Sequence, residues 1–167
     1  MPHFSTHRRV RHSADDMFDL VADIERYPEF VPLCSAMRVI RRTQFADREI
    51  VVAEMQVAYK LIRESFTSRV TLIRGERTIL VEYLDGPFRR MENRWTFRPA
   101  ADGAGKGAGI ALVASPAACE ITFFIFYEFR SRALGLLMGT MFDAAFRRFA
   151  SAFESRADVV FGPARTA

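Results

Sequence analysis

The segment of residues 132–157 reads RALGLLMGTMFDAAFRRFASAFESRA, and it decides the fold. Its apolar residues recur at steps of three and one, which gathers them into a wide stripe on one face of an α-helix. The stripe contains Leu134, Leu137, Met138, Met141, Phe142, Ala145, Phe146, Phe149, Ala152 and Phe153. At 1.5 Å per residue the helix is about 39 Å long, which is enough to lie across a whole β-sheet.

Most of the chain before this helix alternates between apolar and polar residues, which is the period of a β-strand. Strands are expected over residues 4–11, 35–41, 50–59, 62–72, 78–84, 91–97 and 121–129. Short turns join them, and Ser13 ahead of Asp15 and Asp16 predicts the start of one short helix. The sequence therefore predicts an α+β fold: a curved antiparallel sheet of about seven strands wrapped around a long C-terminal helix, in a single domain over residues 1–167.

The composition is that of a folded protein. Half of the residues are hydrophobic and 26% are charged, so the chain is not of the disordered class. No apolar run approaches the roughly 18–20 residues of a membrane span, and the N-terminus lacks the apolar core of a signal peptide. Cys34 and Cys119 have no metal-ligand spacing. We therefore expect a cytoplasmic protein with reduced thiols.

Arginine dominates the basic residues, since only Lys60 and Lys106 among the 24 are lysine. Such a surface suits RNA, a ribosome or anionic lipid, and it also arises when a GC-rich genome favours arginine codons. The sequence leaves these alternatives open and predicts no DNA partner.

Patterns of catalytic or metal-binding residues are absent from the sequence. His3 and His7 share a strand face about 13 Å apart, which is too far to hold one ion, and His12 is expected at the surface or a sheet edge. No nucleophile elbow occurs, and the glycine-rich residues 103–107 lack the ending of a phosphate-binding loop. We expect no catalytic residue and no metal.

Polar residues at inward positions of the strands are more informative. Glu64 shares a face with Phe66, and Asn93 shares a face with Trp95. A buried carboxylate or amide needs a partner. Glu64 pairs with an arginine, both residues orient a mostly apolar ligand, or both of these hold. The candidate arginines are Arg38, Arg41 and Arg94.

The outer face of the last strand is also apolar, at Phe124 and Phe126. This pattern indicates a dimer contact, a membrane contact, or cover from the first helix.

Several motifs resemble the coenzyme Q-binding family of the START-like, polyketide-cyclase-like superfamily. They are YPEFVPLC at residues 27–34, YKLIRESFTSR at 59–69, DGPFR at 85–89, NRWTF at 93–97 and FYEFRS at 126–131. The resemblance runs through almost the whole chain in the same order. Leu33 departs from it, because the family more often has an aromatic residue there, and this change loosens the expected ligand contacts.

The resemblance implies a helix-grip fold with a hydrophobic tunnel between sheet and helix. It also implies that the tunnel binds ubiquinone or a related polyprenyl lipid in support of respiratory electron transport, without catalysis and without a catalytic cofactor. Bacterial proteins of similar sequence are ribosome-association toxins that bind the large subunit, and the wider superfamily contains cyclase-like enzymes. These alternatives stay open.

On this basis we predict a set of ligand-binding residues from the lid at residues 30–33, the strands and the helix. The set is Phe30, Val31, Pro32, Leu33, Met55, Tyr59, Glu64, Phe66, Met91, Asn93, Trp95, Phe123, Leu134, Leu137, Met138, Met141 and Phe142. Gly135 and Gly139, one helical turn apart, are expected to leave a groove. The lid is expected to dock transiently at the inner face of the membrane, with arginines near anionic headgroups.

Overall fold

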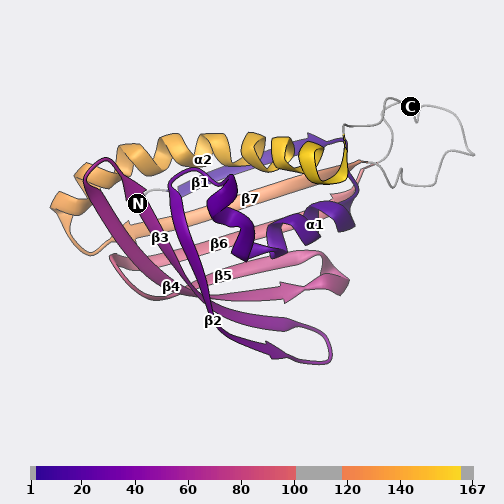
Figure 1. Ribbon diagram of the computed structural model, residues 1–167, viewed down its shortest axis with the longest axis horizontal. Helices are drawn as coiled ribbons and strands as arrows, with labels where there is room; N and C mark the ends of the chain where they lie inside the picture. Colours follow the sequence, from indigo (N-terminus) through magenta and orange to yellow (C-terminus); the bar gives the residue numbers. More distant parts are fainter. Residues whose placement is uncertain (1–2, 101–117, 163–167) are drawn as a thin grey trace, which may run out of the picture.

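The computed structural model describes residues 3–100 and 118–162 (Figure 1). Seven strands form one antiparallel sheet in the order β1-β7-β6-β5-β4-β3-β2. They are β1 (His3–Val10), β2 (Cys34–Gln44), β3 (Glu49–Tyr59), β4 (Ile62–Ile73), β5 (Thr78–Asp85), β6 (Phe88–Pro99) and β7 (Cys119–Phe129). The α-helices are α1 (Ala14–Ala22) and α2 (Arg132–Phe161), and the 3₁₀ turns are η1 (Ile24–Glu29) and η2 (Arg74–Glu76). The glycine-rich residues 103–107 lie outside the described residues.

The predicted fold class is confirmed: a curved antiparallel sheet holds a long C-terminal helix. Helix α2 extends to Phe161, four residues beyond the predicted end. The predicted start of α1 is also confirmed, because the Asp16 amide donates to the Ser13 hydroxyl oxygen at 3.0 Å. Asp15 and Asp16 occupy the first turn, where carboxylates complement the helix dipole.

Irregularities in strand pairing help to curve the sheet. Strand β2 carries register shifts at Cys34/Ala36 and at Val39/Arg41, β5 carries one at Leu84, and β6 carries one between Phe88 and Arg90. Each bulge bends its strand and increases the local twist. The sheet therefore has a concave face that can surround a helix.

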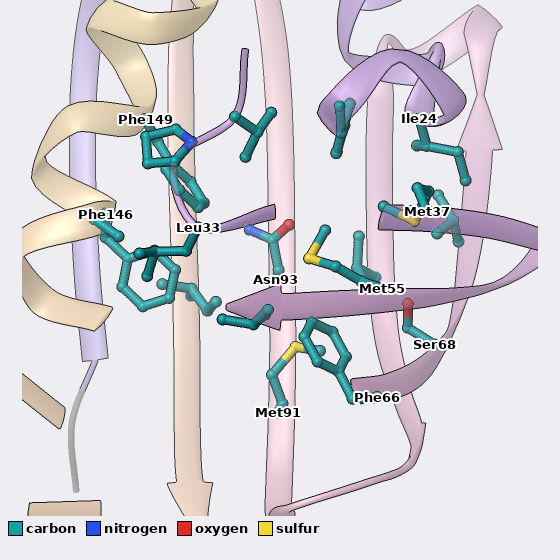
Figure 2. Close-up of a pocket in the computed structure, with 18 of the residues that line it drawn as sticks. Ile24, Leu33, Met37, Met55, Phe66, Ser68, Met91, Asn93, Phe146 and Phe149 are labelled. Atoms are coloured by element: carbon teal, nitrogen blue, oxygen red, sulfur yellow. The ribbon is translucent and has the colours of Figure 1, made fainter. Parts of the chain in front are cut away.

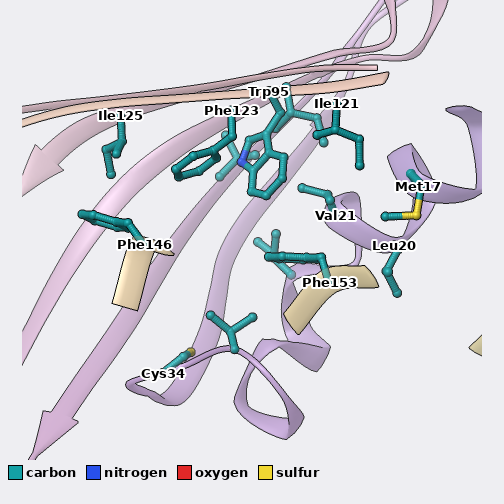
Figure 3. Packing of buried hydrophobic residues seen from close by; sticks show 14 of the residues in the cluster. Met17, Leu20, Val21, Cys34, Trp95, Ile121, Phe123, Ile125, Phe146 and Phe153 are labelled. Carbon is teal, nitrogen blue, oxygen red and sulfur yellow. The ribbon is translucent and has the colours of Figure 1, made fainter. Parts of the chain in front are cut away.

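Both helices pack on this concave face. Phe18 of α1 meets Phe97 of β6 edge-on at 5.9 Å between ring centroids, and Phe153 of α2 meets Trp95 of the same strand at 5.1 Å. Figure 3 shows Met17 and Val21 of α1 on the same side of the sheet as Phe153. Helix α1 therefore does not cover Phe124 and Phe126, which lie half-buried on the opposite face of β7.

The hydrophobic stripe of α2 is buried from Met138 onward. Leu137 was predicted to lie in the buried stripe, but it is 63% exposed. Its neighbour Leu136 is 82% exposed. No helix in residues 3–100 and 118–162 combines the length and the apolar character needed to cross a bilayer.

Candidate functional site

A cavity of about 110 Å³ lies between the concave face of the sheet, α2 and the lid (Figure 2). Strands β2 to β7 all contribute side chains to its wall, and α2 contributes Phe142, Ala145, Phe146, Phe149 and Phe153. Figure 2 shows Phe146 and Phe149 from the helix, with Met55, Phe66 and Met91 from the strands. The wall is almost entirely hydrocarbon, with methionine side chains that adapt easily to a guest.

Many of the predicted ligand-binding residues line this cavity. They are Val31, Pro32, Leu33, Met55, Phe66, Met91, Asn93, Trp95, Phe123 and Phe142. The strand alternation and the helical stripe identified them because both patterns report which face of an element points inward.

The structure places the other predicted residues elsewhere. Tyr59, at the end of β3, is 42% exposed, and Leu137 faces solvent. Phe30 packs edge-on against Phe153 at 5.0 Å and fills space behind the lid. Met138 and Met141 are buried in the core, and Leu134 is half-buried against it, but none of the three lines the cavity. These six residues therefore lie outside the wall of the cavity, and their contact with a ligand stays a prediction.

Gly135 and Gly139 border a separate surface groove of about 420 Å³ between α2 and the end of β7. A Cβ atom at Gly139 would meet nothing within 4 Å. The glycines therefore do leave a groove, but it is open to solvent and distinct from the cavity.

The predicted arginine partner for Glu64 is wrong. Glu64 is half-buried near the start of β4 and makes no ion pair with any residue in the described part of the chain. Arg38 lies 3.6 Å from Glu54, Arg94 lies 3.6 Å from Glu92, and Arg41 is exposed. Water reaches this end of the sheet, so the carboxylate needs no protein partner.

Asn93 is buried at 8% exposure and forms two hydrogen bonds within the protein. Its Nδ2 donates to the carbonyl of Phe124 at 2.9 Å, and its Oδ1 accepts from Trp95 Nε1 at 2.9 Å. An amide has two N–H donors and two acceptor lone pairs, so one of each remains. Asn93 thus orients the indole and still presents a polar edge to the cavity.

Ser68 is the polar residue that the sequence reasoning missed. It lines the cavity at 6% exposure, and its hydroxyl makes no hydrogen bond to another described residue. Tyr83, directly opposite Ser68 on β5, also has a buried hydroxyl without a partner among the described residues. The signal was available, because the alternation of β4 puts Ser68 on the face of Phe66 and Val70. Tyr83 does not line the cavity, but the Ser68 hydroxyl does and is free to donate a hydrogen bond, which marks this wall as a place for a ligand oxygen.

The lid is held closed from both sides. Leu33 lines the cavity in a left-handed backbone conformation (φ 70°), which costs a residue with a Cβ roughly 1–2 kcal/mol. Its carbonyl accepts a hydrogen bond from the Ala58 amide at 3.0 Å, which ties the lid to β3. Val31 is only 6% exposed. The apolar side chains of the lid therefore face the interior.

An ion pair connects the turn before the lid to α2. Glu29 Oε1 lies 2.7 Å from Arg156 Nη2, and the Arg156 guanidinium lies 5.1 Å from the centroid of the Phe30 ring. The hydrogen bond from Arg156 holds the pKa of the Glu29 carboxyl below its usual range. We call this pair the Glu29–Arg156 latch.

The latch is expected to make stability depend on acid pH. The pKa of Glu29 is lower in the folded than in the unfolded protein. The ion pair therefore stabilises the fold fully at a pH above the unfolded-state pKa, and this stabilisation disappears as the pH falls through the folded-state pKa. A double-mutant cycle of Glu29→Gln and Arg156→Met, followed by thermal unfolding, should show a small favourable coupling at pH 7 that shrinks as the pH is lowered below the usual pKa of a glutamate. A coupling that persists unchanged at the acid end would contradict the latch.

The two thiols and His12 lie buried in the protein. Cys34 and Cys119 are free and buried, and burial raises their pKa values to about 11 and about 12, so both remain neutral thiols at pH 7. His12 was expected near the surface, but it is 6% exposed and lies 2.7 Å from Asp158. No group of residues able to hold a metal ion occurs within the described ranges.

Comparison with known proteins gives the family. Residues 10–154 match the family described as polyketide cyclase / dehydrase and lipid transport. The chain belongs to this family. The predicted resemblance is thereby confirmed at the level of the superfamily, and the helix-grip arrangement of the structure agrees with it.

Individual relatives cover nearly the whole chain. The ribosome association toxin RatA of Escherichia coli is 30% identical over 161 residues, covering 96% of this chain and 90% of that protein. The mitochondrial coenzyme Q-binding protein COQ10 homolog B of Xenopus laevis is 26% identical and covers 95% of this chain and 59% of that protein. The solution structure of the 18 kDa protein CC1736 from Caulobacter crescentus is 30% identical with a TM-score of 0.73, covering 97% of this chain and 99% of that one.

Proposed function

We propose that this protein binds the ring of ubiquinone or of a related polyprenyl lipid in the cavity, as a non-enzymatic carrier that supports respiratory electron transport. The observation that carries the proposal is the Ser68 hydroxyl, which lies in a mostly hydrocarbon wall and makes no hydrogen bond to another described residue. A ring oxygen at this position would accept its hydrogen bond. The similarity to a coenzyme Q-binding protein and to a lipid transport family supports the same class of ligand.

The size of the cavity sets what fits while the lid is closed. An engineered apolar cavity of about 150 Å³ takes one benzene molecule. At about 110 Å³ the closed cavity is smaller than that, so the substituted ring of ubiquinone enters only when the lid and the side chains of the wall give way. In the proposal the tail enters only when the lid moves away from α2.

A carrier also fits the physics of the tail. Burying a methylene group is worth about 0.8 kcal/mol relative to water, so a polyprenyl tail does not leave for solvent. Transfer from a bilayer to an apolar cavity is close to neutral and hence reversible. We therefore propose a cytoplasmic protein that visits the inner face of the membrane, with the lipid as its small-molecule partner.

The polar groups support binding in preference to a cyclase-like reaction. Besides Ser68, the wall offers Asn93 and the Tyr27 hydroxyl, which donates to the carbonyl of Val21. Burial raises the pKa of Tyr27, so it is a poor proton donor. General acid–base catalysis needs groups that titrate near the working pH, and these do not.

The direct test is to identify what the protein carries. Native mass spectrometry and organic extraction of the purified protein should reveal a quinone or another polyprenyl lipid, and the emptied protein should take up a short-chain ubiquinone with quenching of Trp95 fluorescence. No bound lipid and no uptake would overturn the proposal.

Ser68→Val should separate binding from stability. Valine suits a strand and removes a hydroxyl that bonds to no described residue, so the free energy of unfolding should change by no more than about 1 kcal/mol. Binding of the short-chain ubiquinone should weaken about tenfold, because one hydrogen bond is lost. Thr67→Val, a half-buried neighbour on the other face of β4, is the matched control. Unchanged affinity in Ser68→Val would argue against a ring oxygen at Ser68.

A second candidate function is ribosome association, since the E. coli toxin RatA is 30% identical over nearly the whole chain. In this alternative the chain would bind the large ribosomal subunit and block subunit joining. Sucrose-gradient profiles with purified subunits test it: a loss of joined ribosomes on adding the protein supports it, and an unchanged profile rejects it.

A further inference from the structure

One end of the sheet gathers three chain connections. Strand pairing runs to Tyr59 and Ile62 in the β3–β4 hairpin, and Phe88 at the start of β6 lies opposite Phe129 at the end of β7. The β3–β4 turn, the β5–β6 turn and the start of α2 therefore lie at the same end. Figure 1 shows the β3–β4 turn and the first turn of α2 at this end, on the left of the view.

This end carries the exposed leucines of the described residues. They are Leu61 at 99% exposure, Leu136 at 82%, Leu137 at 63% and Leu84 at 47%. A single exposed leucine is ordinary, but leucines gathered on adjoining connections indicate a contact surface. We call Leu61, Leu84, Leu136 and Leu137, with the basic residues among them, the leucine end.

Three basic residues of the leucine end are not neutralised by ion pairs. Lys60 and Arg63 flank Leu61, Arg132 lies one helical turn before Leu136, and none of the three is ion-paired with a described residue. Lys60 contacts only the Tyr59 ring, at 5.3 Å from its centroid. Elsewhere some arginines are ion-paired, as Arg8 is with Glu154 and Arg74 with Asp19.

Acidic residues at this end do not cancel that charge. They are Glu64, Asp85 and Glu128, and Glu128 lies 3.6 Å from Arg89. Arg90 adds another exposed cation on β6. The surface therefore combines protruding leucines with an excess of positive charge.

We propose that the leucine end docks on an anionic lipid bilayer. Leucine side chains insert among acyl chains, while lysine and arginine attract anionic headgroups. The charge complementarity favours this partner over a second copy of the chain, whose leucine end carries the same positive charge. RNA would use the cations but would leave the leucines exposed to water.

The location of this surface connects it to the cavity. Phe66 and Phe88, which line the cavity, lie near the ends of β4 and β6 at the leucine end. The groove beside Gly135 and Gly139 opens there too. By contrast, the lid turns Val31 inward, so it is not the element that enters the bilayer. The biological purpose of docking, which is exchange of the lipid with the bilayer, rests on the proposed function. Docking itself can be measured without any quinone.

The experiment is co-sedimentation with vesicles of phosphatidylcholine alone or mixed with phosphatidylglycerol. Binding should need the anionic lipid. Leu61→Asp and the double variant Leu136→Asp/Leu137→Asp should each weaken it at least about tenfold. Val159→Asp, at 76% exposure near the other end of α2, is the matched control and should bind as the parent does. Lys60→Gln/Arg63→Gln should reduce both the lipid preference and the salt dependence.

Several results would overturn docking: no binding to anionic vesicles, equal binding to neutral vesicles, or an equal loss in Val159→Asp. Light scattering that shows a dimer abolished by Leu61→Asp would assign the surface to a second copy, and ribosome binding lost in the same variants without vesicle binding would assign it to RNA. Intact vesicle binding together with failed ubiquinone uptake would reject the proposed function and leave docking standing. Unchanged circular dichroism confirms that each variant is folded.

Discussion

Phe153→Ala is expected to lower the free energy of unfolding by about 3–5 kcal/mol. Phe153 is 2% exposed, and its ring meets Trp95 of the sheet at 5.1 Å, Tyr27 of η1 at 5.5 Å and Phe30 of the lid at 5.0 Å between centroids. One side chain therefore joins α2 to the sheet, to η1 and to the lid. Neighbours fixed in a strand and a helix relax little, so truncation leaves most of the ring's volume empty.

Urea unfolding followed by far-ultraviolet circular dichroism measures this effect, with the denaturant dependence checked for an unchanged slope. Phe45→Ala is the control, since Phe45 follows β2 and is 48% exposed. It should cost less than about 1 kcal/mol. A loss below about 1 kcal/mol in Phe153→Ala would mean that the lid and helix close around the missing ring.

Ala145→Leu is expected to abolish ligand binding while the protein stays folded. Ala145 lines the cavity from α2 at 4% exposure, so three added carbon atoms enter a void of about 110 Å³. A ring and the new side chain do not fit together. Because the void receives the added carbons, stability should change by no more than about 1–2 kcal/mol, near the low end of the usual cost of overpacking.

Titration with a short-chain ubiquinone, read by Trp95 fluorescence, measures the loss. Ala144→Leu is the matched control: it makes the same change one residue away at an exposed position of the same helix and should retain binding. Retained affinity in Ala145→Leu would place the ligand outside this cavity.

The fold was predictable because its signals are local. A period of two specifies each strand, and a wide apolar stripe in the last segment specifies the long helix. The predicted number of strands and the predicted helix cap at Ser13 both agree with the structure. The predicted helix ended at Ala157 rather than Phe161, because Val159 and Val160 do not belong to the stripe. Periodicity shows on which face of a helix or strand a residue lies. It does not show which part of that helix or strand other elements cover.

The candidate site was predicted only in part for the same reason. Leu137 and Tyr59 belong to elements whose ends extend past the sheet and the cavity, which no local pattern reveals. Glu64 attracted attention as a charge at an inward position, yet the end of the sheet is open to water there. Ser68 was overlooked because a small hydroxyl is inconspicuous until the absence of its partner is visible in three dimensions. The volume of the cavity depends on the packing of many side chains together.

The bulges of β2 have a consequence for solubility. An open sheet ends in strands whose free amide and carbonyl groups invite a strand from another molecule, and this sheet ends at β1 and β2. Strand β2 has two bulges, and it carries three arginines, Arg38, Arg41 and Arg42. A strand from another molecule would have to pair with this irregular and charged strand. Irregular spacing and like charges make that addition unfavourable, so the chain can keep an aromatic-rich interior in an open sheet without polymerising edge to edge.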